Sequence, residues 1–135
     1  MDDILFRLLL GHLFGDYLAQ NAWMAENKKK RTLPCVVHCL LYTLWILIFV
    51  PELCAFSFVV NIFMGTLVFF SHFILDRTQI VRWWWGRQRG RYYEEHPEIL
   101  FEPSTVPVGV FVYIVMDNVL HLTMMWLILK LFIIG

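Results

Sequence analysis

At 135 residues, the chain has room for a single domain. Hydrophobic residues make up 59% of it and charged residues 16%, whereas soluble domains average about 45–50% and about 25%, so the composition argues against a soluble core and for a membrane protein. The formal net charge is zero and the three cysteines show no CxxC spacing, which argues against a charge-driven nucleic-acid partner and against a disulfide framework.

Four apolar segments follow one another along the chain, and a bilayer crossing takes about 20 residues. The acidic Asp2 and Asp3 and the lack of a small-residue cleavage pattern indicate that the first segment is a span rather than a signal peptide. We therefore predict an all-α, polytopic membrane protein whose four transmembrane helices form one bundle, a single domain over residues 1–135. The expected helices are Asp3–Ala25, Pro34–Val50, Leu53–Asp76 and Val106–Ile133.

The connections differ in charge. The loop Glu26–Arg31 and the segment Arg77–Pro103 together hold nine of the eleven lysines and arginines, whereas Pro51-Glu52 is a short turn. The positive-inside rule places both basic loops in the cytoplasm and both termini outside the inner (cytoplasmic) membrane. Within Arg77–Pro103, the aromatic run Trp83–Trp85 indicates an interfacial segment, and Glu94–Glu98 a solvated loop.

Histidines and aspartates recur inside the apolar helices. Three helices carry a His and an Asp four residues apart, a spacing that puts both on one helix face, and the other helix carries a single His. An Asp at the centre of a membrane helix costs about 2.5–3.5 kcal/mol, so another group must compensate for its charge. All these His and Asp residues are expected at similar depths, near the membrane midplane or in the cytoplasmic half. We predict one shared metal site opening to the cytoplasm. Its expected ligands are His12, Asp16, His38, His72, Asp76, Asp117 and His121.

The ligand set indicates which metal and which chemistry to expect. Imidazole and carboxylate together suit zinc, manganese or iron better than magnesium or calcium. Three ionised aspartates leave one positive charge on two divalent ions, enough for a bridging hydroxide or an anionic substrate. Two metals can clamp the attacking and leaving oxygens of a displacement. The sequence therefore predicts a metal-dependent hydrolase of a phosphoester in an amphiphilic or lipid-linked substrate, with one or two ions and no assigned catalytic residue.

Residues around the first His/Asp pair point to packing and substrate contacts. Gly11 and Gly15 form a small-xxx-small pair that lets another helix approach. Gln20, Asn27 and Lys28 lie towards the expected mouth of the site and are predicted to contact the substrate. For Lys28, an ordinary positive-inside anchor is an equally good interpretation.

The stretch His12–Gln20 (HLFGDYLAQ), followed by Trp23–Lys28 (WMAENK), resembles the N-terminal signature of a small bacterial and phage membrane-protein family, the domain of unknown function thirty-three-zero-seven. The later His and Asp positions fit that family's pattern, whereas Trp83–Tyr93 does not match it. The family is distantly similar to predicted membrane-bound metal-dependent hydrolases. The resemblance implies a metal-dependent, phosphodiesterase-like activity.

Two other functions fit the same residues. Chains of Asp and His in membrane helices also mark ion or proton pathways, in which the groups would be strung through the bilayer rather than clustered. A metal-free polar network would instead indicate a structural subunit of a membrane assembly. Beyond the bilayer, a homo-oligomer is the further partner expected of so small a unit.

Overall fold

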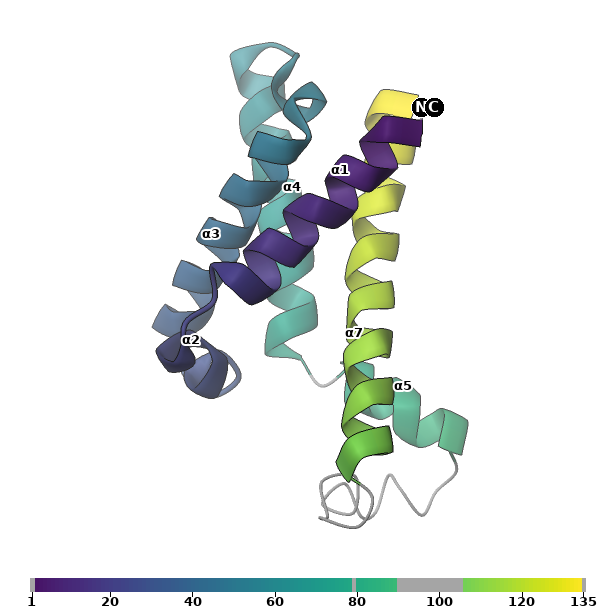
Figure 1. The fold of residues 1–135 in the computed structure, drawn as a ribbon. Coiled ribbons are helices and arrows are strands. Elements are labelled where there is room, and N and C mark those ends of the chain that lie inside the picture. Colours follow the sequence, from purple (N-terminus) through teal and green to yellow (C-terminus); the bar gives the residue numbers. More distant parts are fainter. Residues whose placement is uncertain (1, 79, 90–105, 135) are drawn as a thin grey trace. The chain divides into compact units, whose positions relative to one another are not determined.

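The structure of the protein is a computed structural model that describes residues 2–78, 80–89 and 106–134. All regular elements in this part of the chain are helical, which confirms the all-α prediction (Figure 1). The predicted loop Glu94–Glu98 lies outside the described residues. In chain order the elements are α1 (Asp2–Leu13), η1 (Phe14–Leu18), α2 (Ala22–Asn27), α3 (Thr32–Phe49), η2 (Pro51–Cys54), α4 (Phe58–Arg77), α5 (Ile80–Arg89), α7 (Val106–Leu129) and η4 (Lys130–Ile134).

The chain divides into two compact units. Unit 1 comprises Met1–Arg77 and His121–Gly135, and unit 2 comprises Thr78–Leu120. Unit 2 holds α5 and the first part of α7. On α5, the Arg87 guanidinium lies 5.7 Å from the centroid of the exposed Trp83 ring, so basic and aromatic side chains of the predicted interfacial segment stand together on one short helix.

Three helices are long and apolar enough to cross a membrane: Thr32–Phe49, Phe58–Arg77 and Phe111–Ile133. They correspond to the second, third and fourth predicted spans. The helix of the third predicted span begins at Phe58, five residues later than expected, because Asn61 forms hydrogen bonds that hold the preceding turn. Its amide donates to the Cys54 carbonyl (2.9 Å) and accepts from the Phe56 N–H (3.1 Å).

The first predicted span, Asp3–Ala25, is not one helix, which corrects the expectation from hydropathy. After α1, the π-helical η1 carries an N–H···O bond across five residues, from Ala19 to Phe14 (2.8 Å), and the chain then leaves helical structure. The Asn21 side chain accepts from the Met24 N–H (3.0 Å) and so begins α2 as a new helix. Asparagine favours such N-caps over helix interiors, which is why the break occurs inside an apolar stretch.

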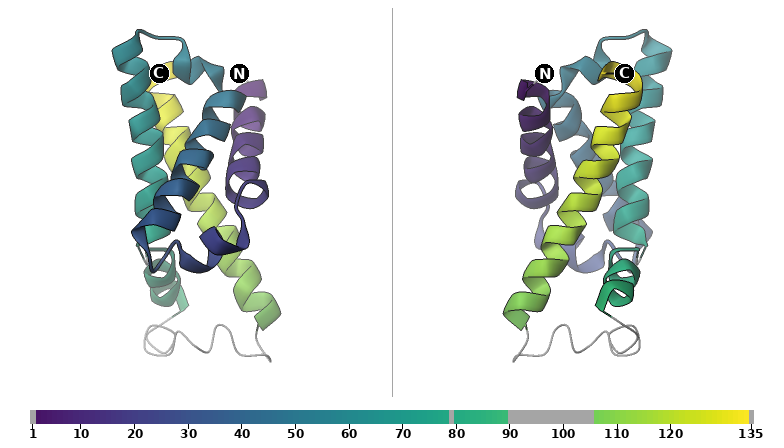
Figure 2. Two further views of the ribbon diagram at one scale, coloured as in Figure 1. Left: turned by 90° about the vertical axis from the view of Figure 1, so that its left-hand side faces the viewer. Right: turned by 90° about the vertical axis from the view of Figure 1, so that its right-hand side faces the viewer.

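The helix α3 is the centre of unit 1. It contacts α1, η1, α2, η2 and α4, and the views in Figure 2 show α1 and α4 on either side of it. The start of α1 and the end of η4 lie at one end of the unit, and α2 and the end of α4 lie at the other (Figures 1 and 2). The buried core is formed by Ile4, Leu8, Tyr42, Ile46, Val50, Leu53, Met64, Val68, Met125, Ile128 and Leu129.

Two glycines let α1 and η1 approach α3 closely, as the small-xxx-small spacing predicts. A Cβ atom at Gly15 would lie 2.9 Å from Tyr42 Cδ2 and 3.0 Å from Tyr42 Cα, and one at Gly11 would lie 3.2 Å from Phe49 Cβ. Side-chain carbon atoms do not fit at these distances without movement. The residue after Gly15 is Asp16, so this approach also sets how near that carboxylate comes to α3.

At the opposite end of unit 1 from α2, a charged pair joins α1 to η2. The Arg7 guanidinium binds both carboxylate oxygens of Glu52, with Nη1 at 3.1 Å from Oε2, and donates to the Phe49 carbonyl at 3.2 Å. This hydrogen bonding from Arg7 holds the pKa of the Glu52 carboxyl below its ordinary value. The pair explains why an arginine occurs among the apolar residues of α1.

Replacing Gly15 with alanine tests the close approach. We expect Gly15→Ala to lower the free energy of unfolding by about 1–3 kcal/mol, because its Cβ must displace the buried Tyr42. Gly65→Ala is the matched control, since the nearest side-chain atom to its Cβ is Leu47 Cδ1 at 3.9 Å. Denaturant unfolding in detergent, followed by circular dichroism, measures both. Equal effects of the two substitutions would contradict the packing interpretation.

Candidate metal centre

Six of the seven predicted metal ligands lie together inside unit 1, and none is more than 4% exposed. They come from α1, η1, α3, α4 and the part of α7 that belongs to this unit. Two lie near helix ends, in the second turn of α3 and the last turn of α4, so the group lies towards the end of the unit that carries α2 (Figure 1). The six are His12, Asp16, His38, His72, Asp76 and His121.

Four ligand atoms of this group converge on one point, which we name position A: Asp16 Oδ1, His38 Nε2, His72 Nε2 and Asp76 Oδ2. His38 Nε2 lies 3.2 Å from the Asp16 oxygen, 3.1 Å from the Asp76 oxygen and 3.0 Å from His72 Nε2. His72 Nε2 lies 3.4 Å from the same Asp76 oxygen and 4.0 Å from the Asp16 oxygen. Zinc–nitrogen bonds of about 2.0–2.1 Å in a tetrahedron put ligand atoms about 3.3 Å apart, so the spacing suits a metal ion.

Hydrogen bonds among these four residues alone do not account for this arrangement. Each imidazole Nε2 carries at most one hydrogen, yet His38 Nε2 faces two carboxylate oxygens and a second imidazole nitrogen. With His38 and His72 nitrogens 3.0 Å apart, one of the two must present a lone pair. That lone pair then faces the Asp76 carboxylate, a repulsive contact. A cation at position A would accept electron pairs from all four atoms at once.

Lys28 supplies part of the missing positive charge. Its Nζ lies 2.8 Å from Asp76 Oδ2, 3.5 Å from Asp16 Oδ1 and 3.3 Å from His38 Nε2. The side chain is 12% exposed, and the Arg77 guanidinium donates to the Lys28 carbonyl (3.3 Å), which fixes the turn after α2. One ammonium against two carboxylates leaves a negative charge, so the centre can accept a further cation.

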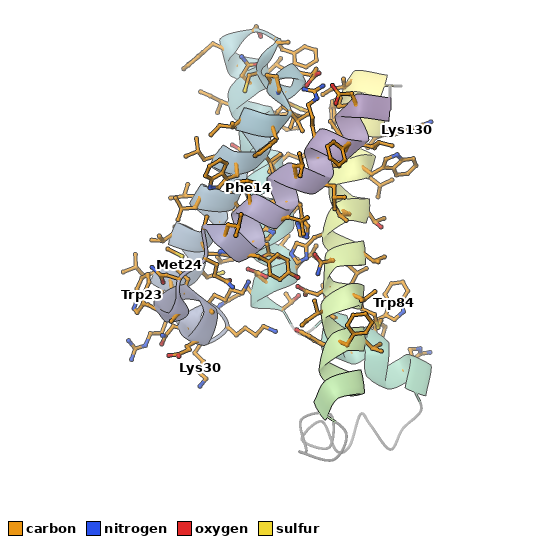
Figure 3. The ribbon with its side chains drawn as sticks, viewed as in Figure 1. Phe14, Trp23, Met24, Lys30, Trp84 and Lys130 are labelled. Atoms are coloured by element: carbon orange, nitrogen blue, oxygen red, sulfur yellow. The ribbon has the colours of Figure 1, made fainter. Side chains whose placement is uncertain are left out.

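The neighbouring basic residues behave differently from Lys28. Lys29, Lys30 and Arg31 are exposed, and Figure 3 shows the Lys30 side chain pointing away from the helices. Their exposure suits positively charged anchors at the membrane surface. Lys28, by contrast, turns into the buried cluster.

The other predicted site residues are Asp117, Asn27 and Gln20. Asp117 belongs to unit 2, four residues before His121 on α7, and is half-buried. The Asn27 amide donates to the Trp23 carbonyl within α2 (2.9 Å). Gln20 is half-buried, and its Oε1 has no hydrogen-bond partner among the described residues. The roles of these residues remain predictions.

Tyr42 is a residue of this cluster that the His/Asp pattern missed. It is fully buried, its hydroxyl lies 3.1 Å from His12 Nδ1, and its ring stacks on His72 with centroids 3.6 Å apart and planes 10° apart. Groups behind a ligand fix its ring orientation and the nitrogen that it presents. The position of Tyr42, four residues after His38 on α3, was the available signal, because it puts both side chains on one helix face.

The comparisons with known proteins identify a family. The model of the family described as "Protein of unknown function (DUF3307)" matches residues 4–134. Neither a curated protein nor a solved structure matches the chain.

Removing one carboxylate tests the metal centre. We expect protein purified in detergent without added metal to contain a transition metal, and Asp76→Asn to lose at least about tenfold in metal affinity, since it removes an anionic ligand atom from position A. Asp3→Asn is the control, because that side chain is 78% exposed. Elemental analysis after dialysis reads the metal content. Wild-type protein that binds no metal would contradict the site.

Replacing Lys28 separates a metal centre from a metal-free ion pair. We expect Lys28→Met to raise metal affinity by about tenfold, because the ammonium competes with the metal for the oxygens of Asp16 and Asp76. Lys30→Met, at an exposed position, should leave the affinity unchanged. Zinc titration against a chromophoric chelator measures both. Loss of folding without any metal binding in Lys28→Met would indicate a structural salt bridge instead.

Proposed function

We propose that this chain, which belongs to the family of proteins of unknown function DUF3307, is a membrane-embedded metal-dependent hydrolase of a phosphoester in an amphiphilic or lipid-linked substrate. The observation that carries the proposal is the convergence of two carboxylates and two imidazoles on position A, at ligand spacing and out of solvent. Zinc, manganese and iron are the metals that suit these donors.

In this proposal, the metal and the side chains of the protein have different tasks. A bound divalent ion would supply a Lewis acid and a nucleophilic water near neutral pH. The buried ligands exclude bulk water and hold the coordination geometry, and Tyr42 keeps the His72 ring in place by stacking. Asp117, one helical turn before His121, is proposed as an additional ligand on the strength of that spacing.

Lys28 is proposed to bind the substrate phosphate. Its ammonium lies beside position A and is partly exposed, so it can reach both the ligands and an incoming anion. A metal bound to the carboxylate oxygens would leave the Lys28 ammonium able to pair with a phosphate oxygen. Gln20 and Asn27 are proposed to contribute polar contacts on the same side, because both lie in the chain between Asp16 and Lys28.

The membrane setting supports this substrate class. Three helices are long and apolar enough to span a bilayer, and the buried cluster lies near the end of unit 1 where the basic turn Lys28–Arg31 is found. With the positive-inside orientation, the site would open towards the cytoplasmic interface, where lipid phosphates lie.

Clustering separates this proposal from the alternatives. In a proton or ion pathway the titratable groups would be spread across the membrane, whereas the four ligand atoms of position A lie within 4.8 Å of one another. A structural role in a larger assembly would need no metal, and the Lys28 pair with Asp76 would then be the main compensation.

Hydrolysis can be measured directly on short-chain lipids. We expect manganese- or zinc-loaded protein in detergent to cleave dioctanoyl phosphatidylglycerol or dioctanoyl phosphatidic acid. Phosphorus NMR measures the cleavage, and a metal chelator should stop it. At saturating metal, Lys28→Met should raise KM about tenfold, since a charge-assisted hydrogen bond contributes about 1.5–3 kcal/mol, while Lys30→Met should not. Metal-loaded protein that cleaves neither lipid would contradict the hydrolase proposal.

A further inference from the structure

The helix α5 is short, basic and rich in tryptophan. Its sequence, IVRWWWGRQR over Ile80–Arg89, holds three arginines, three tryptophans and no acidic residue. Ten helical residues rise about 15 Å, which is half of the roughly 30 Å of a bilayer's hydrocarbon core. α5 is therefore too short to cross a membrane, and its arginines make a position inside the hydrocarbon costly.

The chain ties α5 to the end of a helix that is apolar enough to span a bilayer. This helix, α4, ends at Arg77, and α5 begins at Ile80. The chain between these two residues can extend over at most about 11 Å. The headgroup layer on each side of a bilayer is roughly 5–8 Å thick. If α4 spans the bilayer, α5 therefore begins within this layer or just beyond it.

One face of α5 combines exposed aromatic side chains with an arginine. Four residues share the i, i+3, i+4, i+7 spacing that puts side chains on one side of a helix, and we name them the Trp–Arg face: Ile80, Trp83, Trp84 and Arg87. Trp83 and Trp84 are 57% and 44% exposed, and Arg87 is exposed as well. Val81, which lies outside this set, is buried. α5 therefore has a covered side and an exposed, aromatic and basic side.

The two kinds of side chain on the Trp–Arg face suit the two layers of a membrane interface. The Arg87 guanidinium lies 5.7 Å from the centroid of the Trp83 ring. Such a contact uses the charge of the cation and the face of the ring, so the N–H groups in the guanidinium plane can still donate in pairs to a phosphate. Indole rings favour the depth at which acyl chains meet headgroups.

We propose that the Trp–Arg face of α5 binds anionic lipids at the membrane interface, with Arg87 on a lipid phosphate and the Trp83 and Trp84 indoles beside the upper acyl chains. The three arginines of α5 complement an anionic headgroup, whereas a zwitterionic headgroup carries no net charge. A soluble acidic partner would match the charge, but the tether to α4 holds this face at the bilayer. The contact needs no metal, so it is independent of the metal centre and of the proposed hydrolysis.

Fluorine NMR of the full chain, labelled with 5-fluorotryptophan in phosphatidylcholine nanodiscs, tests this contact. We expect a gadolinium-chelating lipid to broaden the Trp83 and Trp84 signals, and phosphatidylglycerol to shift the Trp83 signal. Arg87→Gln should need about fivefold more phosphatidylglycerol for the same shift, because it removes one positive charge at the surface, whereas Arg87→Lys should stay within about twofold of wild type. The Trp45 signal is the control and should not shift, since this ring packs against Phe14.

Three results would overturn the proposal. A Trp83 signal that is the same in phosphatidylcholine and phosphatidylglycerol would exclude a preference for anionic lipid. Broadening by a water-soluble gadolinium chelate, but not by the gadolinium lipid, would place the face away from the bilayer. A signal that changes with the number of chains per disc, and not with the lipid, would indicate a second copy on this face. If Arg87→Gln fails to fold by circular dichroism, the comparison of lipids in wild type still decides.

Discussion

Two carboxylates buried in an apolar helix bundle need positive charge beside them, and the rest of unit 1 is arranged around this need. Asp16 and Asp76 are 4% and 2% exposed. Removing the partner of a buried charge costs about 3–5 kcal/mol, a large share of the net stability of a domain. Lys28 supplies one ammonium from the turn after α2. The imidazoles around the carboxylates can supply electron pairs to a metal but no charge while they are neutral, so the proposed cation completes the balance.

Helix packing and site geometry are linked through Tyr42. The absence of a side chain at Gly15 lets η1 lie against Tyr42, which brings the neighbouring Asp16 within 3.2 Å of His38 on the same helix α3. Tyr42 also stacks on His72 and contacts His12. A substitution that moved η1 outwards would therefore change ligand distances as well as stability, and the centre and the core must be regarded as one packed structure.

The outer surface of the helices is apolar. α3 and α4 expose residues such as Leu40, Leu44, Phe58 and Ile62, which suits contact with lipid. A shallow groove of about 580 Å³ between these helices is lined almost entirely by apolar side chains and contains none of the His or Asp residues of the cluster. Such a lining suits contact with lipid acyl chains.

The sequence by itself determined that the protein is helical, where three long apolar helices lie, and which residues could ligate a metal. These are local properties: a long apolar segment predicts where a membrane helix lies, and on a helix a spacing of four residues puts His72 and Asp76 on one face whatever the fold. Only the tertiary structure decided that η1 interrupts the first segment, that Lys28 turns inwards, that Tyr42 holds two histidines, and which oxygen of each aspartate faces which ring. Those features depend on how helices rotate and approach one another, and that is set by contacts between residues far apart in the chain, such as Gly15 with Tyr42. A pattern within a single helix, such as Gly11 and Gly15, indicates that another helix can approach, but not which residues of that helix it contacts.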